Sequence, residues 1–275
     1  MTLKNYNDRS ESHFIRHGPC SSCGSSDANA IYSDNHQVCF ACDAYVHGDN
    51  SVPSNLSKPK ARPLEMTGTI AAIQDRRISM DTAKRYGVTV ETGADGVISK
   101  HHYPYHSQEG TQVVGTKVRN VASKDFYATG DLGSAGLFGQ QSFAAGGKYI
   151  TITEGEIDAM AAYEMNGGFP AVSIRSGAAA AVKDIKASLE YLETFDNVVI
   201  CFDTDEAGTK AAQAVLPLFS PRKAKVCTLP LKDAGEMLKA NKVREYTRCW
   251  WEAKAFKPEG VVSLSDTGVW DKFLK

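Results

Sequence analysis

Hydrophobic and polar positions in the second half of the chain alternate between the period of strands and that of helices. The β-branched run Lys148–Thr153 predicts a buried strand, and the apolar residues within 156–165 recur at helical spacing. Further elements are predicted in order: a strand at Pro170–Ile174, a helix ending near Thr194, a strand at Asn197–Phe202, a helix over 206–216 and a strand at Lys225–Leu229. This order is typical of βαβ units, so we predict an α/β fold with a mainly parallel sheet.

Two breaks in the pattern divide the chain. The segment 51–63 holds three prolines and small polar residues with almost no apolar periodicity, which predicts a flexible linker. A second break near Lys257 leaves a short tail that could connect to another domain. We therefore predict an N-terminal module, a linker, a basic α+β subdomain, a catalytic α/β subdomain and a C-terminal tail, at residues 1–50, 51–63, 64–147, 148–257 and 258–275.

The composition, with 42% hydrophobic residues in 275, is sufficient for a buried core. No apolar run reaches the roughly 20 residues that cross a bilayer, so we expect no membrane association. The first residues, MTLKNYNDRS, lack the cationic-then-apolar pattern of a secretory signal. We therefore expect a cytoplasmic protein that is not secreted.

Charge is distributed unevenly along the chain. Residues 57–150 carry 12 basic and 8 acidic side chains, whereas 1–56 carry 3 and 6 and 151–275 carry 16 and 18. A basic middle between acidic flanks indicates a polyanionic partner held at one place, although a solvated surface has the same composition.

Four of the seven cysteines form two CxxC pairs, Cys20 with Cys23 and Cys39 with Cys42, separated by 15 residues. This spacing favours a zinc ribbon in which four thiolates hold one Zn²⁺ tetrahedrally. Four protein ligands leave no open coordination position, so the ion is expected to be structural. A module of about 50 residues also needs the free energy of metal binding to fold.

The same module is acidic, which argues against unspecific binding to phosphates and favours recognition of bases. Asp34, Asn35 and His36 lie just before the second CxxC pair, and Tyr32 and Phe40 flank them. These side chains could hydrogen-bond to base edges or stack on bases. A solvent-facing loop histidine is an equally good interpretation of His36.

Acidic residues follow three of the predicted strands. Glu154 comes after the first, Asp203 and Asp205 after a later one, and Asp233 after the last. The carboxyl ends of parallel strands meet at one edge of a sheet, where carboxylates repel one another unless a cation neutralises them. Oxygen ligands favour Mg²⁺ or Mn²⁺, and such a site suits phosphoryl transfer.

These segments resemble a known family. Glu154-Gly155 and the run FDTDEAG (202–208) are similar to the Toprim signature of primases and topoisomerases. Together with the four-cysteine module, DRRIS (75–79), TKVR (116–119) and KDAGE (232–236), they resemble the primase half of the T7-type bacteriophage primase–helicases.

The resemblance implies synthesis of short RNA primers on single-stranded DNA from ribonucleoside triphosphates, for lagging-strand replication. The implied cofactors are one structural Zn²⁺ and one or two catalytic Mg²⁺ or Mn²⁺. The implied partners are the single-stranded DNA template, the RNA primer, a replicative helicase (fused or separate) and a DNA polymerase, in the host-cell cytoplasm if the chain is phage-encoded.

The resemblance also implies roles for individual residues. The acidic catalytic and metal-binding positions are Glu154, Asp203, Asp205 and Asp233, with Glu154 either a ligand or a general base. The template-recognition positions are Asp34 and His36. The basic positions that contact nucleotide phosphates or template are Arg76, Lys117, Arg119 and Lys124, and Lys117 and Lys232 are candidates to neutralise the triphosphate.

Other interpretations remain at this point. A non-catalytic recombination or repair mediator also pairs a four-cysteine zinc site with a Toprim domain, and Toprim nucleases and topoisomerases share the acidic motif. Arg175 is a further candidate to face phosphate. The run His101–His106 could supply stacking contacts, but a strand and turn on the subdomain surface is the simpler interpretation.

Overall fold

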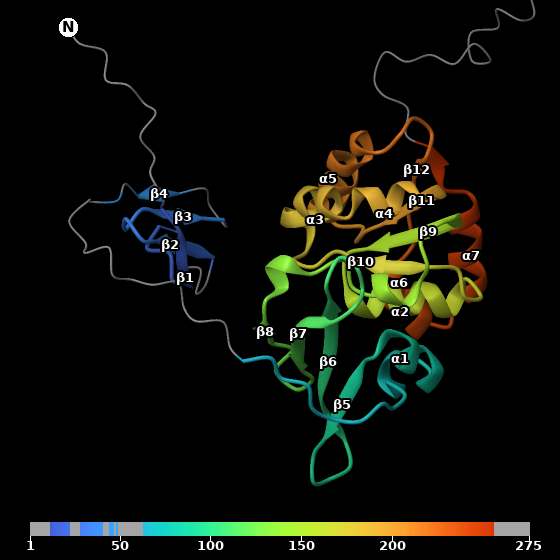
Figure 1. Ribbon diagram of the computed structural model, residues 1–275, viewed down its shortest axis with the longest axis horizontal. Helices are drawn as coiled ribbons and strands as arrows, with labels where there is room; N and C mark the ends of the chain where they lie inside the picture. Colours follow the sequence, from blue (N-terminus) through green and yellow to red (C-terminus); the bar gives the residue numbers. More distant parts are fainter. Residues whose placement is uncertain (1–11, 23–27, 41–43, 47, 49–62, 256–275) are drawn as a thin grey trace, which may run out of the picture. The chain divides into compact units, whose positions relative to one another are not determined.

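The computed structural model describes residues 12–22, 28–40, 44–46, 48 and 63–255. The chain divides into two compact units, Met1–Ala61 and Arg62–Lys275 (Figure 1). Apart from Pro63, the predicted linker lies outside the described residues, as does the predicted tail 258–275.

The N-terminal unit contains a four-stranded antiparallel sheet in the order β1-β2-β3-β4. Its strands are β1 (Phe14–Gly18), β2 (Asn29–Tyr32), β3 (Gln37–Cys39) and β4 (Tyr45–Val46). The turn between β2 and β3 contains Asn35 with φ of 62°, a left-handed conformation that asparagine adopts more readily than most residues. Cys20 and Cys39 are both buried beside this sheet.

The second unit begins with the short 3-10 helix η1 (Gln74–Arg76) and α1 (Met80–Tyr86). Ser79 caps α1 by accepting a hydrogen bond from the Thr82 amide, and Gly87 ends it at φ of 73°. An antiparallel meander follows in the order β5-β6-β7-β8, called the meander sheet below. Its strands are β5 (Thr89–Thr92), β6 (Ile98–His106), β7 (Val113–Asn120) and β8 (Phe126–Gly130).

The placement of His101–His106 on the subdomain surface was wrong. His101, His102, Tyr103 and Tyr105 are at most 2% exposed, because β6 is a central strand of the meander sheet. The two tyrosines belong to the same buried cluster as residues of the helix after β9. Burial lowers the pKa of His101 to about 4, so this histidine is neutral at physiological pH.

A second sheet, called the parallel sheet below, has the order β10-β9-β11-β12-β13. Its strands are β9 (Gly147–Thr153), β10 (Ala171–Ser173), β11 (Phe195–Cys201), β12 (Ala224–Val226) and β13 (Lys254–Ala255). The first four pair in parallel and β13 adds an antiparallel edge. The predicted α/β class with a mainly parallel sheet is therefore confirmed.

Helices cover both faces of the parallel sheet (Figure 1). On one face lie α2 (Glu156–Met165), α6 (Ala234–Lys239) and α7 (Val243–Trp251), and on the other α3 (Ala181–Ala187), α4 (Leu189–Glu193) and α5 (Glu206–Val215). The helix predicted to end near Thr194 is broken at Ser188 into α3 and α4. Short 3-10 turns connect other elements: η2 (Leu132–Ser134), η3 (Gln140–Ser142), η4 (Ala178–Ala180) and η5 (Leu216–Leu218). None of the helices in the described ranges has the length and apolar character of a membrane span.

The alternation of β9 explains how both faces are filled. Ile150 and Ile152 belong to the cluster with α3 to α5, whereas Thr151 and Thr153 alternate with them and are equally buried. The hydroxyl of Thr151 accepts a 2.9 Å hydrogen bond from the indole N–H of Trp250, which is 2% exposed. This contact fastens α7 to the sheet and satisfies a polar group in the core.

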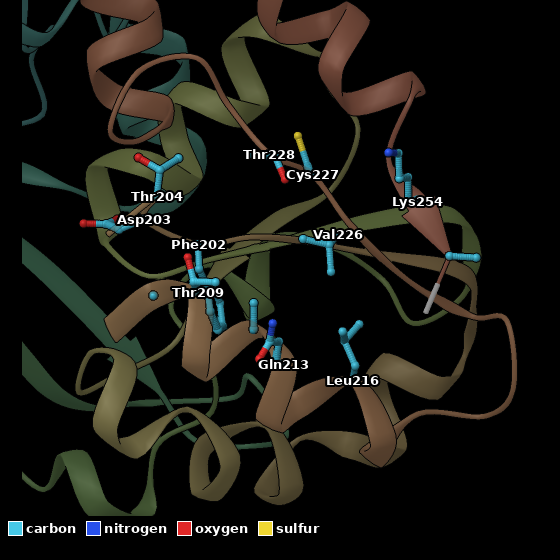
Figure 2. A pocket seen from close by; sticks show the side chains of 13 residues that line it. Phe202, Asp203, Thr204, Thr209, Gln213, Leu216, Val226, Cys227, Thr228 and Lys254 are labelled. Atoms are coloured by element: carbon cyan, nitrogen blue, oxygen red, sulfur yellow. The ribbon is translucent and has the colours of Figure 1, made fainter. Parts of the chain in front are cut away.

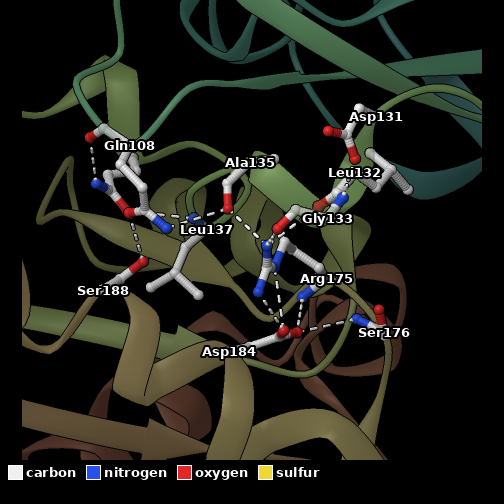
Figure 3. A network of polar contacts seen from close by, with 11 residues as sticks. Gln108, Asp131, Leu132, Gly133, Ala135, Leu137, Arg175, Ser176, Asp184 and Ser188 are labelled. Atoms are coloured by element: carbon white, nitrogen blue, oxygen red, sulfur yellow. Dashed lines mark hydrogen bonds and ion pairs between the residues drawn. The ribbon is translucent and has the colours of Figure 1, made fainter. Parts of the chain in front are cut away.

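Arg175 follows β10, and all three of its guanidinium nitrogens donate hydrogen bonds within the protein (Figure 3). Its Nε and Nη2 donate to Asp184 Oδ1 at 3.0 and 2.7 Å, and its Nη1 donates to the backbone oxygens of Leu132, Gly133 and Ala135. Both charged side chains are at most 5% exposed. The expectation that Arg175 faces phosphate was wrong, because this guanidinium ties the loop after the meander sheet to the parallel sheet.

The buried pair yields a stability prediction. Asp184→Ala leaves the Arg175 charge buried without its partner, so we expect the free energy of unfolding to fall by about 3–5 kcal/mol. Urea denaturation followed by circular dichroism measures the change. Glu206→Gln is the matched control, because it removes one partner of an ion pair whose side chains are 73% and 83% exposed. Equal stability losses in the two variants would refute the structural role of the Arg175 pair.

Candidate active site

The topology brings the predicted acidic loops together. β9 and β11 are adjacent, with Thr153 opposite Cys201, so Glu154 and Asp203 leave the sheet at the same edge. β12 lies on the other side of β11, and the amide of Thr204 donates a 2.8 Å hydrogen bond to the carbonyl of Lys232. The loops after β9, β11 and β12 therefore converge, and we call this the acidic edge.

Glu154 is half-buried at the acidic edge. Its Oε1 accepts a 3.1 Å hydrogen bond from the amide of Ala178. Its Oε2 is buried without a partner of hydrogen-bond geometry among the described residues. Burial, followed by the charge of Asp203, raises the pKa of Glu154 above its ordinary value. An anchored carboxylate with one unused buried oxygen is suited to accept a proton or a cation.

Asp203 has a cation beside it. Lys232 Nζ lies 2.9 Å from Asp203 Oδ2, with side-chain exposures of 60% for the lysine and 15% for the aspartate. Burial raises the pKa of Asp203 even though Lys232 favours its charged form, and Asp203 in turn raises the pKa of Lys232. The negative potential of the acidic edge thus already attracts the ammonium group of Lys232, whose side chain is mostly exposed.

Asp205 and Asp233 each cap a helix. Asp205 accepts a 2.9 Å hydrogen bond from the amide of Gly208 at the start of α5, and Asp233 accepts a 2.7 Å bond from the amide of Glu236 at the start of α6. Capping orients each carboxylate and stabilises its charge near a helix N-terminus. Asp205 is exposed, and Asp233 is half-buried.

Asp158 is an acidic neighbour that sequence reasoning missed. It lies on the first turn of α2 and accepts a 2.8 Å hydrogen bond from the amide of Gly235. Burial, followed by the adjacent carboxylate of Asp233, raises the pKa of Asp158 well above its ordinary value. The local sequence gives no signal for this role, because the partner of Asp158 lies 77 residues away.

Glu156 is a second missed residue, and it links the two sheets. Its Oε1 accepts a 2.5 Å hydrogen bond from the hydroxyl of Tyr105 and lies 2.6 Å from Lys117 Nζ. The carboxylate side chain is only 6% exposed, whereas that of Lys117 is 21% exposed. Lys117, a predicted phosphate contact, is thereby held at the junction of β7 and α2.

A cavity of about 210 Å³ opens between the meander sheet and the acidic edge, and we call it the junction cavity. Seven charged or aromatic side chains line it: Arg76, Tyr103, Arg119, Phe126, Glu156, Asp158 and Asp233. Two of the predicted basic residues, Arg76 and Arg119, therefore line the same cavity as the predicted acidic residue Asp233. Lys124 does not line it, since it is exposed in the turn between β7 and β8.

A second hollow of about 650 Å³ lies beside the acidic edge (Figure 2). Asp203 and Thr204 lie at one end and Lys254 of β13 at the other, with Leu216 and Val226 on the walls. Among the predicted acidic residues, Asp203 lines this hollow, whereas Glu154, Asp205 and Asp233 do not.

In the N-terminal unit, the predicted recognition residues form one array. Asp34 Oδ1 lies 2.6 Å from His36 Nδ1 and accepts a 2.7 Å hydrogen bond from the hydroxyl of Ser12. Desolvation opposes the charged form of Asp34, but hydrogen bonds from Ser12 and His36 outweigh it and lower its pKa. The ring of His36 stacks on Tyr32, with 4.0 Å between centroids, and on Tyr45 at 5.8 Å.

The zinc ligand set is only partly described. Cys23 and Cys42 lie outside the described residues, while Cys20 is 5% and Cys39 0% exposed. Across the described part of the chain, no three His, Cys, Asp or Glu side chains form a group that could hold a metal ion as they stand.

The acidic edge nevertheless fits a hard divalent cation. Its donors are carboxylate oxygens, the Oε2 of Glu154 is buried without a hydrogen-bond partner among the described residues, and burial followed by neighbouring carboxylates raises the pKa values of Glu154 and Asp203. A cation there would replace Lys232, which is free to withdraw because most of its side chain is exposed.

The raised pKa of Glu154 predicts that this residue lowers the stability of the folded protein in a pH-dependent way. In the folded protein Glu154 binds its proton more tightly than in the unfolded chain, so stability falls as pH rises from the ordinary value of 4.5 through the raised one. Glu154→Gln keeps the acceptor for Ala178 and removes the charge. We expect its Tm to exceed that of the wild type by about 2–4 °C at pH 8.

Thermal unfolding without divalent cations, from pH 4 to pH 8, tests this expectation. The advantage of Glu154→Gln should shrink toward pH 4, where both proteins are uncharged at this position. An advantage that does not change with pH would show that the charge of Glu154 is not its cause.

Comparisons with known proteins agree with this geometry. Residues 151–238 match the family model described as Toprim-like. The DNA helicase/primase of Enterobacteria phage T3 is 33% identical over 269 residues, which cover 92% of this chain and 46% of that protein. The chain thus spans about half the length of this curated relative.

Two solved structures are similar over larger shares of their own length. The primase fragment of the bacteriophage T7 primase–helicase is 35% identical, with a TM-score of 0.64 over 87% of this chain and 100% of that chain. A primase domain from a structure of the T7 lagging-strand DNA polymerase with an RNA/DNA hybrid is also 35% identical, with a TM-score of 0.61 over 69% and 94%. The chain therefore belongs to the family of T7-type bacteriophage primase–helicases and corresponds to its primase part.

Proposed function

We propose that this protein is a DNA primase that synthesises short RNA primers on single-stranded DNA from ribonucleoside triphosphates. The observation that carries the proposal is that Glu156 and Asp158 of α2 and Asp233 of the acidic edge line the junction cavity together with Arg76 and Arg119. Nucleotidyl transfer needs both signs of charge in one place, because anionic triphosphates must approach carboxylates that hold a cation. Membership in the primase–helicase family supports the same activity.

The acidic edge would hold one or two Mg²⁺ or Mn²⁺ ions through carboxylates of Glu154, Asp203, Asp205 and Asp233. When bound, the ion stabilises charge on phosphate oxygens and lowers the pKa of the attacking hydroxyl. Lys117 and Arg119 from the meander sheet, Arg76 from η1 and Lys232 from the acidic edge would neutralise the triphosphate. Lys124, which is exposed in the turn between β7 and β8, would contact template or primer.

The reaction joins two nucleotides. The 3′-hydroxyl oxygen of the first nucleotide attacks the α-phosphorus of the second, its proton is lost, and pyrophosphate leaves with the electrons of the broken P–O bond. The unpartnered Oε2 of Glu154 supplies an acceptor at this position, for the proton or for the cation.

The N-terminal unit would be a zinc ribbon that recognises template bases. Its four zinc ligands would be Cys20, Cys23, Cys39 and Cys42. Asp34 fixes the imidazole of His36, whose ring stacks on Tyr32 and lies near Tyr45. This arrangement supports hydrogen bonding to base edges beside a stacking surface.

Partners follow from the relatives. The T3 relative is a helicase/primase, and the T7 structure contains a DNA polymerase that interacts with primase domains. We therefore propose that this chain works with a replicative helicase, fused or separate, and delivers primers to a DNA polymerase in the cytoplasm of a host cell.

Incorporation of labelled ribonucleotides on randomised single-stranded DNA tests the activity. Asp203→Ala removes a central carboxylate of the acidic edge, so we expect dinucleotide formation to fall by at least about 10³-fold. His36→Ala should reduce template-directed synthesis by about 10-fold and leave untemplated condensation nearly unchanged, because it alters only base recognition.

Circular dichroism confirms that each variant is folded. Wild-type protein that binds single-stranded DNA but incorporates no ribonucleotide would favour the non-catalytic mediator and overturn the proposal. Equal losses of templated and untemplated synthesis in His36→Ala would remove the recognition role of that residue.

Cation binding can be measured without activity. If Mg²⁺ binds the acidic edge, a concentration of ten times its Kd adds about 1.4 kcal/mol of stability, or about 3–5 °C in Tm. Asp203→Asn should lose most of this increase, whereas the control Asp196→Asn, exposed at the amino end of β11, should keep it. A Tm increase retained in full by Asp203→Asn would place the ion elsewhere.

A further inference from the structure

Phe126 is an exposed aromatic residue beside the charged groups of the junction cavity. It is the first residue of β8, it lines the junction cavity, and 52% of its surface is exposed. A large apolar side chain on an exposed strand gains little from burial, so its contribution to the core is small. Its ring borders the cavity where Arg119 and Asp233 also lie.

The meander sheet places two cations next to this ring. Arg119 is the direct partner of Phe126 across β7 and β8, and Lys117 lies two residues before Arg119 on the same face. The Arg119 Cζ is 5.6 Å and the Lys117 Nζ 5.8 Å from the ring centroid. These cation–π contacts fix the ring and leave an aromatic surface next to two positive charges.

The guanidinium of Arg119 has one buried nitrogen, Nε, without a hydrogen-bond partner among the described residues. The junction cavity is also lined by Asp158 of α2 and by Asp233 of the acidic edge. The cavity thus combines an aromatic ring, the guanidinium of Arg119 and carboxylates within one small volume of about 210 Å³.

A nucleoside triphosphate has the complementary chemistry. Its base has a flat π-face, its phosphates are anionic, and the cation that accompanies them is attracted by carboxylates. Base–aromatic stacking is independent of base identity to a first approximation, because every base has a π-face. This tolerance suits an enzyme that must accept different nucleotides at one position.

We propose that Phe126 is a nucleobase-stacking residue, on which the base of a bound ribonucleotide lies while Arg119 and Lys117 contact its phosphates. The inference rests on the proposed primase function and adds to it a binding position for the base. Cross-strand packing of Phe126 with Arg119 is the competing role, and it would affect stability instead of base binding.

The test compares two probes with and without a base. Titrations of ATP and of inorganic tripolyphosphate, both with Mg²⁺, are followed by calorimetry for wild type, Phe126→Ala, Phe126→Leu and Phe126→Trp. We expect Phe126→Ala and Phe126→Leu to raise the Kd for ATP by about 5- to 30-fold and to change that for tripolyphosphate by less than about 2-fold. Phe126→Trp should bind ATP at least as tightly as wild type.

Tyr127→Ala is the matched control. Tyr127 is the next residue of β8, so its side chain points to the opposite face of the sheet, and its removal should leave both Kd values unchanged. Equal effects of Phe126→Ala on ATP and tripolyphosphate, no effect on either, or full ATP affinity in Phe126→Leu would overturn the stacking role.

The two proposals can fail separately. Wild-type protein that binds ATP through Phe126 but incorporates no ribonucleotide would refute the primase function alone. Primer synthesis by the wild type, together with unchanged ATP affinity and KM in Phe126→Ala, would refute the stacking role alone.

Discussion

Mutual repulsion between carboxylates at the end of the parallel sheet is the constraint on which the site depends. Parallel pairing of β9, β11 and β12 forces Glu154, Asp203 and Asp233 toward one edge, and partial burial removes the water that would screen them. Burial is the first cause of the raised pKa values of Glu154, Asp203 and Asp158, and the charges of neighbouring carboxylates add to it. Core packing and helix capping hold these loops in place in spite of this unfavourable energy. A cation that binds there is stabilised by the same negative potential that destabilises the carboxylates.

Two of the positive charges near the acidic edge come from the meander sheet. Lys117 and Arg119 lie on β7, and their position depends on how the meander sheet packs against α2. Two buried polar contacts hold that packing: Tyr105 and Lys117 with Glu156, and Arg175 with Asp184 and the backbone that follows the meander sheet. Neither contact involves the carboxylates of Glu154 or Asp203. Both nevertheless determine the positions of Lys117 and Arg119 relative to those carboxylates.

Sequence periodicity was sufficient for the parallel sheet and its acidic edge, since strand runs such as Lys148–Thr153 and the acids that follow them are local patterns. Features that depend on tertiary packing were missed. The histidines and tyrosines of β6 were expected on the surface, because only the covering of the meander sheet by other elements shows that they are buried. Arg175 was expected at phosphate, since its buried partner Asp184 is nine residues away on another element. Asp158 and Glu156 were passed over because their neighbours, Gly235 and Tyr105, lie far away in sequence.

The central claim is that carboxylates from β9 and β11 share one divalent cation. A crystal structure of the protein grown with Mn²⁺, with anomalous diffraction recorded at the manganese edge, tests it most directly. The account predicts a peak within coordination distance of both Glu154 and Asp203, with Lys232 displaced from Asp203. A peak bound by only one of these carboxylates, or no peak at the acidic edge at a saturating Mn²⁺ concentration, would contradict it.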